Sequence, residues 1–155
     1  MTYYKLGFFS AIALWVATIA TAAYFFVKGH TVSSADARTA VVLTDVERDQ
    51  ILAEMRQFLK AVHGVLEAVV VQDLSHAERS ARTAGMAMSV DVNPIIIAKL
   101  PLTFKAMGMA VHRDFDALAD GIQSGETGKQ VVKRLSDLTS RCTACHELYR
   151  FSASK

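Results

Sequence analysis

Proline and glycine are scarce in this sequence, with two prolines and eight glycines among 155 residues. Strand-rich folds need frequent turns, and those turns use glycine and proline at short, regular intervals. Apolar residues instead recur three and four positions apart through much of the chain, which is typical of helices that bury one face. The sequence therefore predicts an all-α protein without strands.

Excess charge of one sign is also missing, since the formal net charge is only +2. Proteins that follow a phosphate backbone carry basic runs interleaved with aromatic residues, and no such run is present. No Ser/His/Asp or paired-carboxylate arrangement stands out either. We therefore expect no nucleic-acid partner and no hydrolytic enzyme, and 155 residues leave room for one domain with a core.

The longest stretch without charge lies at the N-terminus, between Lys5 and Lys28. It is long enough to cross a bilayer, which takes roughly 20 apolar residues, whereas the apolar core of a signal peptide is usually about 7–15 residues. Aromatic residues, which favour the membrane interface, stand at both ends: Tyr3, Tyr4, Tyr24, Phe25 and Phe26. The sequence predicts a transmembrane anchor over 1–30, a polar linker over 31–43 and one domain over 44–155.

The domain divides into four amphipathic helical segments. Thr44 with Glu47 predicts a capping box at the start of the first, and Ser75 with Glu78 predicts another at the start of the second. Pro94 should break the pattern after the second segment, and Pro101 suits the first turn of the third. A glycine-containing loop over 121–128 precedes the fourth. Four such helices with short loops predict an antiparallel four-helix bundle.

Each segment carries an apolar stripe that should face the core. The second stripe is mostly alanine, which means either close packing on a neighbour or room left for something bulky. The expected inner faces are Leu52, Met55, Leu59, Val62, Leu66 and Val69; Ala77, Ala81, Ala84 and Met88; Phe104, Met107, Val111, Phe115, Leu118 and Ile122; and Val131, Leu135, Leu138, Cys142, Cys145 and Tyr149.

The two cysteines stand in the run Cys142-Thr-Ala-Cys145-His146. Residues three apart lie on one face of a helix, so both thiols can add to the two vinyl groups of one haem. His146 can then bind the iron axially. This spacing is the attachment signature of c-type haem, and we expect one covalent haem c held by Cys142, Cys145 and His146 and facing the bundle interior.

Other uses of this cysteine pair fit less well. A structural zinc site needs two more thiolate or imidazole ligands nearby, but there is no third cysteine, and His30, His63, His76 and His112 are scattered. We expect those histidines to be surface or internally satisfied residues. A thioredoxin-like redox pair belongs in a βαβ unit, and a disulfide across one helical turn has poor geometry.

The C-terminal run from Arg141 to Arg150, ending a chain of four helices, resembles the cytochrome c-prime family, the class II c-type cytochromes. The resemblance covers roughly 44–151. It implies that a residue of the first bundle helix covers the distal face of the iron. Methionine there gives a six-coordinate, low-spin electron carrier, whereas a noncoordinating residue gives a five-coordinate haem that binds NO or CO. It also implies that Arg150 lies near the proximal His146 and contacts solvent or a haem propionate; a cation favourable at a helix C-terminus is the plainer reading of Arg150.

The sixth ligand has several candidates. No methionine follows His146, so a methionine ligand has to come from upstream, where Met55, Met88 and Met107 are all expected to face inward. The resemblance places the residue over the distal iron face at Met55 or within one position of it, and therefore favours Met55. The family often has an arginine four positions before the distal residue, but Ile51 stands there. Alignment on Arg48 would place Leu52 over the iron, and alignment on Arg56 would place Lys60 there.

The leading hypothesis is an electron carrier, not an enzyme, that passes single electrons between a membrane redox complex and other electron-transfer proteins in a respiratory or photosynthetic-type chain. Haem c is attached outside the bacterial cytoplasmic membrane, so we expect a single-pass inner-membrane protein with its haem domain in the periplasm. A five-coordinate haem protein that binds NO or CO is the alternative. A third possibility is a structural subunit of a larger membrane assembly.

Overall fold

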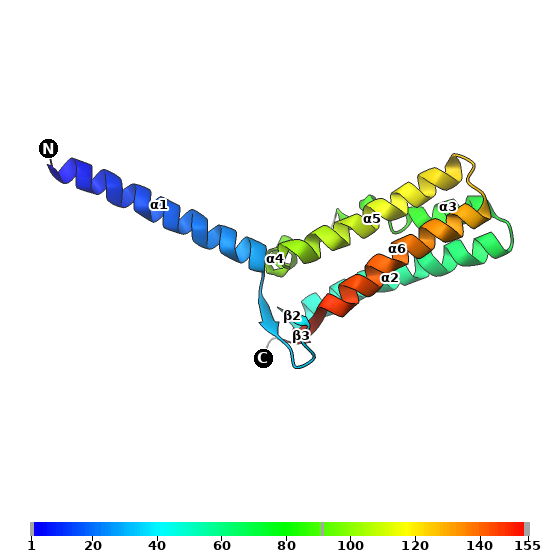
Figure 1. Cartoon of the computed structure of the whole chain (residues 1–155), viewed down its shortest axis with the longest axis horizontal. Helices are drawn as coiled ribbons and strands as arrows, with labels where there is room; N and C mark the ends of the chain where they lie inside the picture. Colours follow the sequence, from blue (N-terminus) through cyan, green and yellow to red (C-terminus); the bar gives the residue numbers. More distant parts are fainter. Residues whose placement is uncertain (1, 91, 154–155) are drawn as a thin grey trace.

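The computed structural model describes residues 2–90 and 92–153, and its N-terminal helix stands apart from the rest of these residues (Figure 1). Helix α1, Thr2–Lys28, extends away from the other helices, and its side chains from Gly7 to Lys28 are exposed. By length and composition, Gly7–Lys28 is able to cross a membrane, although a signal sequence would pass the same test. The prediction of one N-terminal apolar helix is confirmed.

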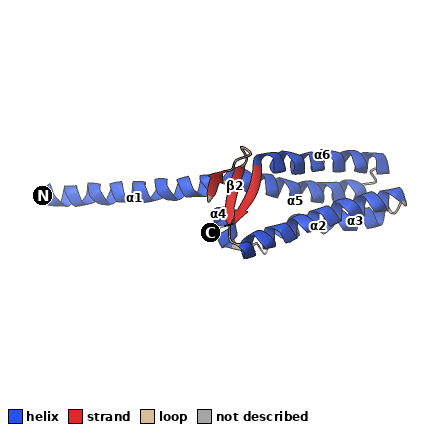
Figure 2. Ribbon diagram, turned by 90° about the horizontal axis from the view of Figure 1, so that it is seen from below, coloured by secondary structure: helices blue, strands red, loops and turns tan. Residues whose placement is uncertain are grey.

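The remaining described residues are mostly helical. Three long helices, α2 (Asp45–Val70), α5 (Leu102–Gln123) and α6 (Gly128–Leu148), run beside one another, and the shorter α3 (Leu74–Arg82) packs on α2 and α5 (Figures 1 and 2). They enclose one core cluster: Ala61, Val65, Ala68, Ala77, Ala81, Ala84, Val111, Phe115, Leu118, Ala119, Ile122, Val131, Leu135 and Leu138. A 3₁₀ turn, η1 (Met86–Ser89), and a short helix, α4 (Pro94–Lys99), link α3 to α5. The second expected bundle helix is thus a short helix followed by a 3₁₀ turn.

A small sheet corrects the expectation of an all-α domain behind a loose linker. Strands β1 (Thr31–Ser33) and β2 (Thr39–Leu43) pair antiparallel, and β2 pairs in parallel with β3 (Tyr149–Ala153) (Figure 2). The cause is burial: Val41 and Leu43 of β2 are fully buried in a second core cluster with Ile51, Ile96, Leu100 and Phe104. Through this sheet, the segment that follows α1 is joined directly to the end of α6.

The buried face of α2 is rotated from the predicted stripe. Leu59 is 69% exposed and Leu66 is 43% exposed, whereas Ile51, Ala61, Val65 and Ala68 are buried. Close approach of α3 explains the rotation, because a Cβ on Gly64 would lie only 2.7 Å from the Ser80 hydroxyl oxygen. Small residues face one another across this contact, so the alanine-rich stripe serves close helix packing. The predicted stripes of α5 and α6 are confirmed at their buried positions.

Helix capping follows the sequence at one of the two predicted positions. The Thr44 hydroxyl accepts from the Glu47 N–H at 3.3 Å, and the Thr44 N–H donates to the Glu47 carboxylate at 2.8 Å, so the first capping box is confirmed. The second is wrong. The N-cap of α3 is Asp73, two residues before Ser75, and its carboxylate accepts from the His76 N–H at 2.9 Å.

Candidate functional site

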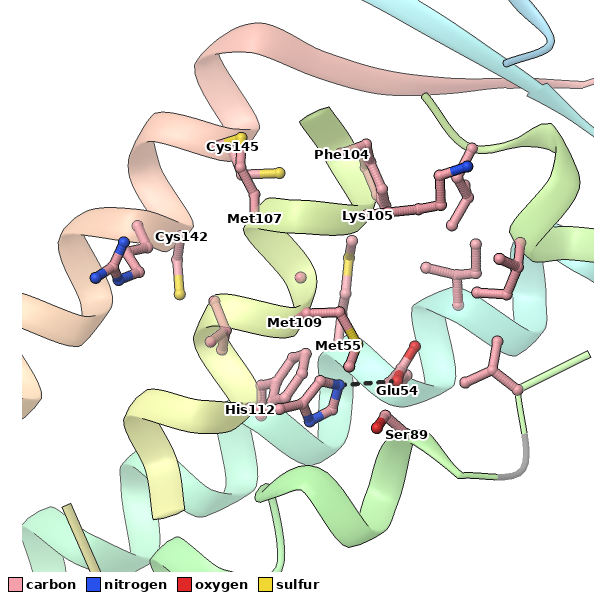
Figure 3. A pocket seen from close by; sticks show the side chains of 18 of the residues that line it. Glu54, Met55, Ser89, Phe104, Lys105, Met107, Met109, His112, Cys142 and Cys145 are labelled. Atoms are coloured by element: carbon pink, nitrogen blue, oxygen red, sulfur yellow. Dashed lines mark ion pairs between the residues drawn. The ribbon is translucent and has the colours of Figure 1, made fainter. Parts of the chain in front are cut away.

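A cavity of about 250 Å³ lies between α2, α5 and α6, at the end of the domain that carries α4 (Figure 3). Most of the side chains around it are apolar, and sulfur atoms are frequent among them. The lining residues are Ile51, Glu54, Met55, Phe58, Ser89, Val92, Ile97, Leu100, Phe104, Lys105, Met107, Gly108, Met109, Val111, His112, Arg141, Cys142, Cys145 and His146.

Cys142 and Cys145 both lie on the α6 wall of this cavity, as the three-residue spacing predicts (Figure 3). Both are free and half-buried. Burial raises the pKa of each thiol, so at neutral pH both are protonated S–H groups. The described residues contain no cluster of three or more His, Cys, Asp or Glu side chains able to hold a metal ion by themselves. The two thiols are thus half-buried, neutral groups on one wall of an apolar cavity.

His146 is exposed and lies at the edge of the same cavity. Its backbone carbonyl accepts a hydrogen bond from the Arg38 guanidinium at 3.2 Å. Arg38 is held in turn by Asp36 at 2.6 Å, and Arg38 and Ser34 keep the pKa of Asp36 far below its ordinary value. The loop between β1 and β2 thus fixes the backbone of α6 at the histidine.

The residues that the sequence offered as a sixth ligand fall into two groups, those that line the cavity and those that do not. Met55, from α2, and Met107, from α5, line the cavity with the two cysteines (Figure 3). Met88, Lys60 and Leu52 are not among the lining residues. The structure therefore brings together four of the five site residues expected from the sequence: Cys142, Cys145, His146 and Met55.

Arg150 is the fifth, and it lies elsewhere. It is exposed on β3, outside the cavity wall, and its guanidinium is 3.5 Å from the Asp36 carboxylate. Two other cations line the cavity instead: Lys105 on α5, and Arg141, which is paired with Asp114. The position of Arg141 immediately before Cys142 was the only sequence signal that could have identified it.

An ion pair between buried His112 and half-buried Glu54 was not predicted from the sequence. His112 is 4% exposed; its Nε2 lies 3.4 Å from the Glu54 carboxylate (Figure 3, dashed line), and its Nδ1 lies 2.9 Å from the Ala84 carbonyl and 3.1 Å from the Gly85 carbonyl. Burial alone would lower the pKa of His112. The Glu54 carboxylate and the two carbonyls outweigh burial, so the pKa is raised. Protonated His112 donates from both ring nitrogens and ties α2 and α5 to the end of α3.

This raised pKa predicts a stability that falls as the pH rises. A group whose folded pKa exceeds its unfolded value, about 6.5 for histidine, stabilises the fold fully below that value and loses the contribution as the pH passes the folded pKa. We expect the unfolding temperature of the protein in detergent to decline above about pH 6.5. In His112→Gln this decline should be absent or much reduced.

His63→Gln is the matched control. His63 is 76% exposed and lies 3.8 Å from Glu67, so it is also a His–Glu pair but fully hydrated. Exposed pairs contribute little, and its pH profile should match that of the unaltered protein. Equal flattening of the profile in both variants would show that another group is responsible for the pH dependence.

Comparisons of the chain with protein-family models, with curated proteins and with solved structures give no match. The cavity and the residues that line it are therefore the basis for a functional proposal.

Proposed function

We propose that this protein is a membrane-anchored c-type cytochrome that transfers single electrons, with one haem c held in a four-helix bundle in which α3 and η1 stand in for the second helix. One observation carries the proposal. The haem-attachment motif Cys142-Thr-Ala-Cys145-His146 lines an apolar cavity whose opposite wall, α2, supplies Met55. The residues that we assign to haem attachment and to the two iron ligands therefore line one cavity.

The chemistry of the cavity suits a haem. Its walls are apolar, as a macrocycle requires, and two basic side chains, Lys105 and Arg141, are among its lining residues. A volume of about 250 Å³ is small for an enclosed ligand, because ligand pockets usually hold about 300–1,000 Å³. A haem edge would remain exposed near His146, and an exposed edge is where a partner can exchange electrons.

Each residue would have a distinct task. Cys142 and Cys145 attach the group, each adding its sulfur and its proton across one vinyl double bond. His146 on α6 and Met55 on α2 would supply the protein ligands of the iron. A haem held here would supply one-electron redox chemistry. Phe58, Phe104 and Val111 would keep water away from it, and this burial would help to set its reduction potential.

The anchor and the attachment chemistry together give the location that we propose. Haem c is attached outside the bacterial inner membrane, so α1 would cross that membrane once, with the remaining helices in the periplasm. The partners would be a membrane redox complex or other electron-transfer proteins. A five-coordinate haem that binds NO or CO is the alternative if Met55 leaves the iron open.

Export of the full chain in a bacterium that carries the haem c maturation machinery tests the proposal. We expect a haem band that survives denaturing electrophoresis, and reversible one-electron reduction of the purified protein in detergent. Expression of the same chain in a strain that lacks the maturation machinery is the control and should yield no haem band. A mature chain that carries no haem in the presence of that machinery would contradict the proposal.

A further inference from the structure

The C-terminal end of α1 is held against the domain by direct contacts and is not joined to it by a flexible linker. Gly29, the residue after the helix, has φ +66°, and a Cβ at this position would lie 2.5 Å from the Lys99 carbonyl oxygen. The next residue, His30, donates its N–H to that same carbonyl at 2.7 Å. Only glycine allows the chain to pass so close to the end of α4, so the direction of α1 is defined relative to α4.

Lys105 makes a second connection between α1 and the domain. Its ammonium donates to the Phe26 carbonyl at 3.2 Å and lies 3.8 Å from the centre of the Phe26 ring. A cation over an aromatic face is attracted by the negative charge of the ring face. Because this connection starts from α5 and the Gly29 contact starts from α4, α1 is held from two elements at once.

The three successive isoleucines of α4 have different surroundings. Ile96 is fully buried in the core, and Ile97 lines the cavity. Ile95 points to neither and is 62% exposed. Two further apolar side chains near the junction are exposed as well, Leu102 at 42% and Val32 at 49%. Isolated exposed apolar residues need no explanation, but these three belong to elements that meet at one point.

Their distance from the junction is limited by the chain itself. Ile95 lies about one helical turn before Lys99, a rise of about 6 Å. Val32 and Leu102 lie two or three residues from Gly29 and Leu100, at most about 10 Å along an extended chain. Gly29 touches the backbone of Lys99, Leu100 and Pro101, so all three exposed side chains are attached close to the end of α1.

The end of α1 also marks the level of a membrane surface. Tyr24 and Lys28 form an amphipathic pair there, with the ammonium 2.9 Å from the phenol oxygen. Aromatic rings and lysines with that character favour the interface between acyl chains and headgroups. In both ribbon views, α4 and the sheet lie at the end of the domain next to α1, and the long helices lead away from it (Figures 1 and 2).

We propose that this end of the domain rests on the bilayer surface, with Ile95 of α4 inserted among the lipid headgroups beside the anchor. The inference rests on the proposed anchor role of α1. Lipid is the occupant because the exposed residues adjoin a helix able to span the bilayer, at the level where that helix leaves it. Interfacial apolar groups commonly reach about 5–10 Å into this layer.

A second membrane contact fixes the orientation of the domain. Because the Gly29 and Lys105 contacts fix α1 to the domain, the two move as one body, and a second membrane contact at Ile95 resists tilting of that body in the bilayer. Ile97, Leu100 and Lys105 line the cavity and belong to the same end. The cavity is therefore held close to the membrane surface, within reach of a partner embedded in the same bilayer.

Photo-cross-linking of the full chain in nanodiscs of phosphatidylcholine and phosphatidylglycerol tests the proposal. We substitute p-benzoylphenylalanine, one site at a time, at Ile95, at Leu14 in α1 and at Val71 at the far end of α2. Val71 is 67% exposed, comparable to Ile95, but is separated from β2 by the whole of α2, about 39 Å. Lipid adducts are identified by mass spectrometry, a measurement that does not depend on haem.

We expect lipid adducts at Leu14 and Ile95 and none at Val71. Adducts at Leu14 alone would overturn the membrane contact and leave the anchor intact. Absence of a lipid adduct at Leu14 would contradict the anchor role of α1, and the proposed membrane contact of Ile95 would be excluded with it. Equal adducts at Ile95 and Val71, or an adduct between Ile95 and a second copy of the chain, would also overturn the proposal. Circular dichroism checks that each variant is folded, which the exposure of all three sites favours.

Discussion

Replacing both Cys142 and Cys145 by alanine should leave the exported protein without covalently bound haem. Each thiol supplies one thioether bond, and both line the cavity in which the macrocycle would lie. The single variants should keep one bond and therefore a weaker haem band. Haem staining after denaturing electrophoresis and the mass of the intact chain measure the outcome.

Thr143→Ala is the control for the cysteine variants. Thr143 lies between the two cysteines on α6 but is exposed and is not among the cavity-lining residues. Its hydroxyl donates to the Ser140 carbonyl one turn earlier, at 2.8 Å. Haem attachment should be unchanged in this variant. Full covalent haem in the double cysteine variant would exclude thioether attachment at this motif.

Local patterns predicted the parts of the fold that local interactions determine. The stripes of α5 and α6 were correct because each of these helices turns one continuous apolar face to the core, including Phe115, Leu118 and Leu135. The Thr44 cap was correct because its hydrogen bonds lie within four residues of sequence. The cysteine motif is local in the same sense, and helical spacing was enough to place both thiols on one wall.

Contacts between distant segments account for the errors. The sheet forms because β2 pairs with β3, at the opposite end of the sequence, so no window of a few residues reveals it. The close approach of α3 at Gly64 determines which face of α2 is buried, and this face is not the one with the strongest apolar stripe. The pairing of Glu54 with His112 likewise joins two helices whose registers are set by packing.

The same distinction applies to the candidate site. The part of the cavity wall formed by α6 could be predicted, because Cys142, Cys145 and His146 lie within one five-residue run. Which residue lies across the cavity from α6 depends on how α2 and α5 pack. From the sequence alone, the candidates were Met55, Met88, Met107, Lys60 and Leu52. The cavity reduces that set to Met55 and Met107 among the described lining residues, and these two can be separated by experiment.

Met55→Ala should convert a low-spin haem into a high-spin one that binds CO readily once reduced. Removing the methionine leaves the distal iron face open, and the reduction potential should fall because methionine ligation raises it. Cys142 and Cys145 would keep the haem attached. Loss of the half-buried side chain should cost about 2 kcal/mol, the low end of the range for methionine to alanine. Optical and EPR spectra of the ferric protein report the spin state.

Met107→Ala is the matched control, since Met107 is a second half-buried methionine on the same cavity but on α5. It should lose comparable stability and keep the low-spin spectrum, because the proposal assigns the ligand role to Met55. A change of spin state in Met107→Ala with none in Met55→Ala would transfer the ligand role to α5. If the unaltered protein is already high-spin and neither substitution changes its spectrum, the iron has no methionine ligand. The protein is then a five-coordinate haem protein that binds NO or CO rather than an electron carrier.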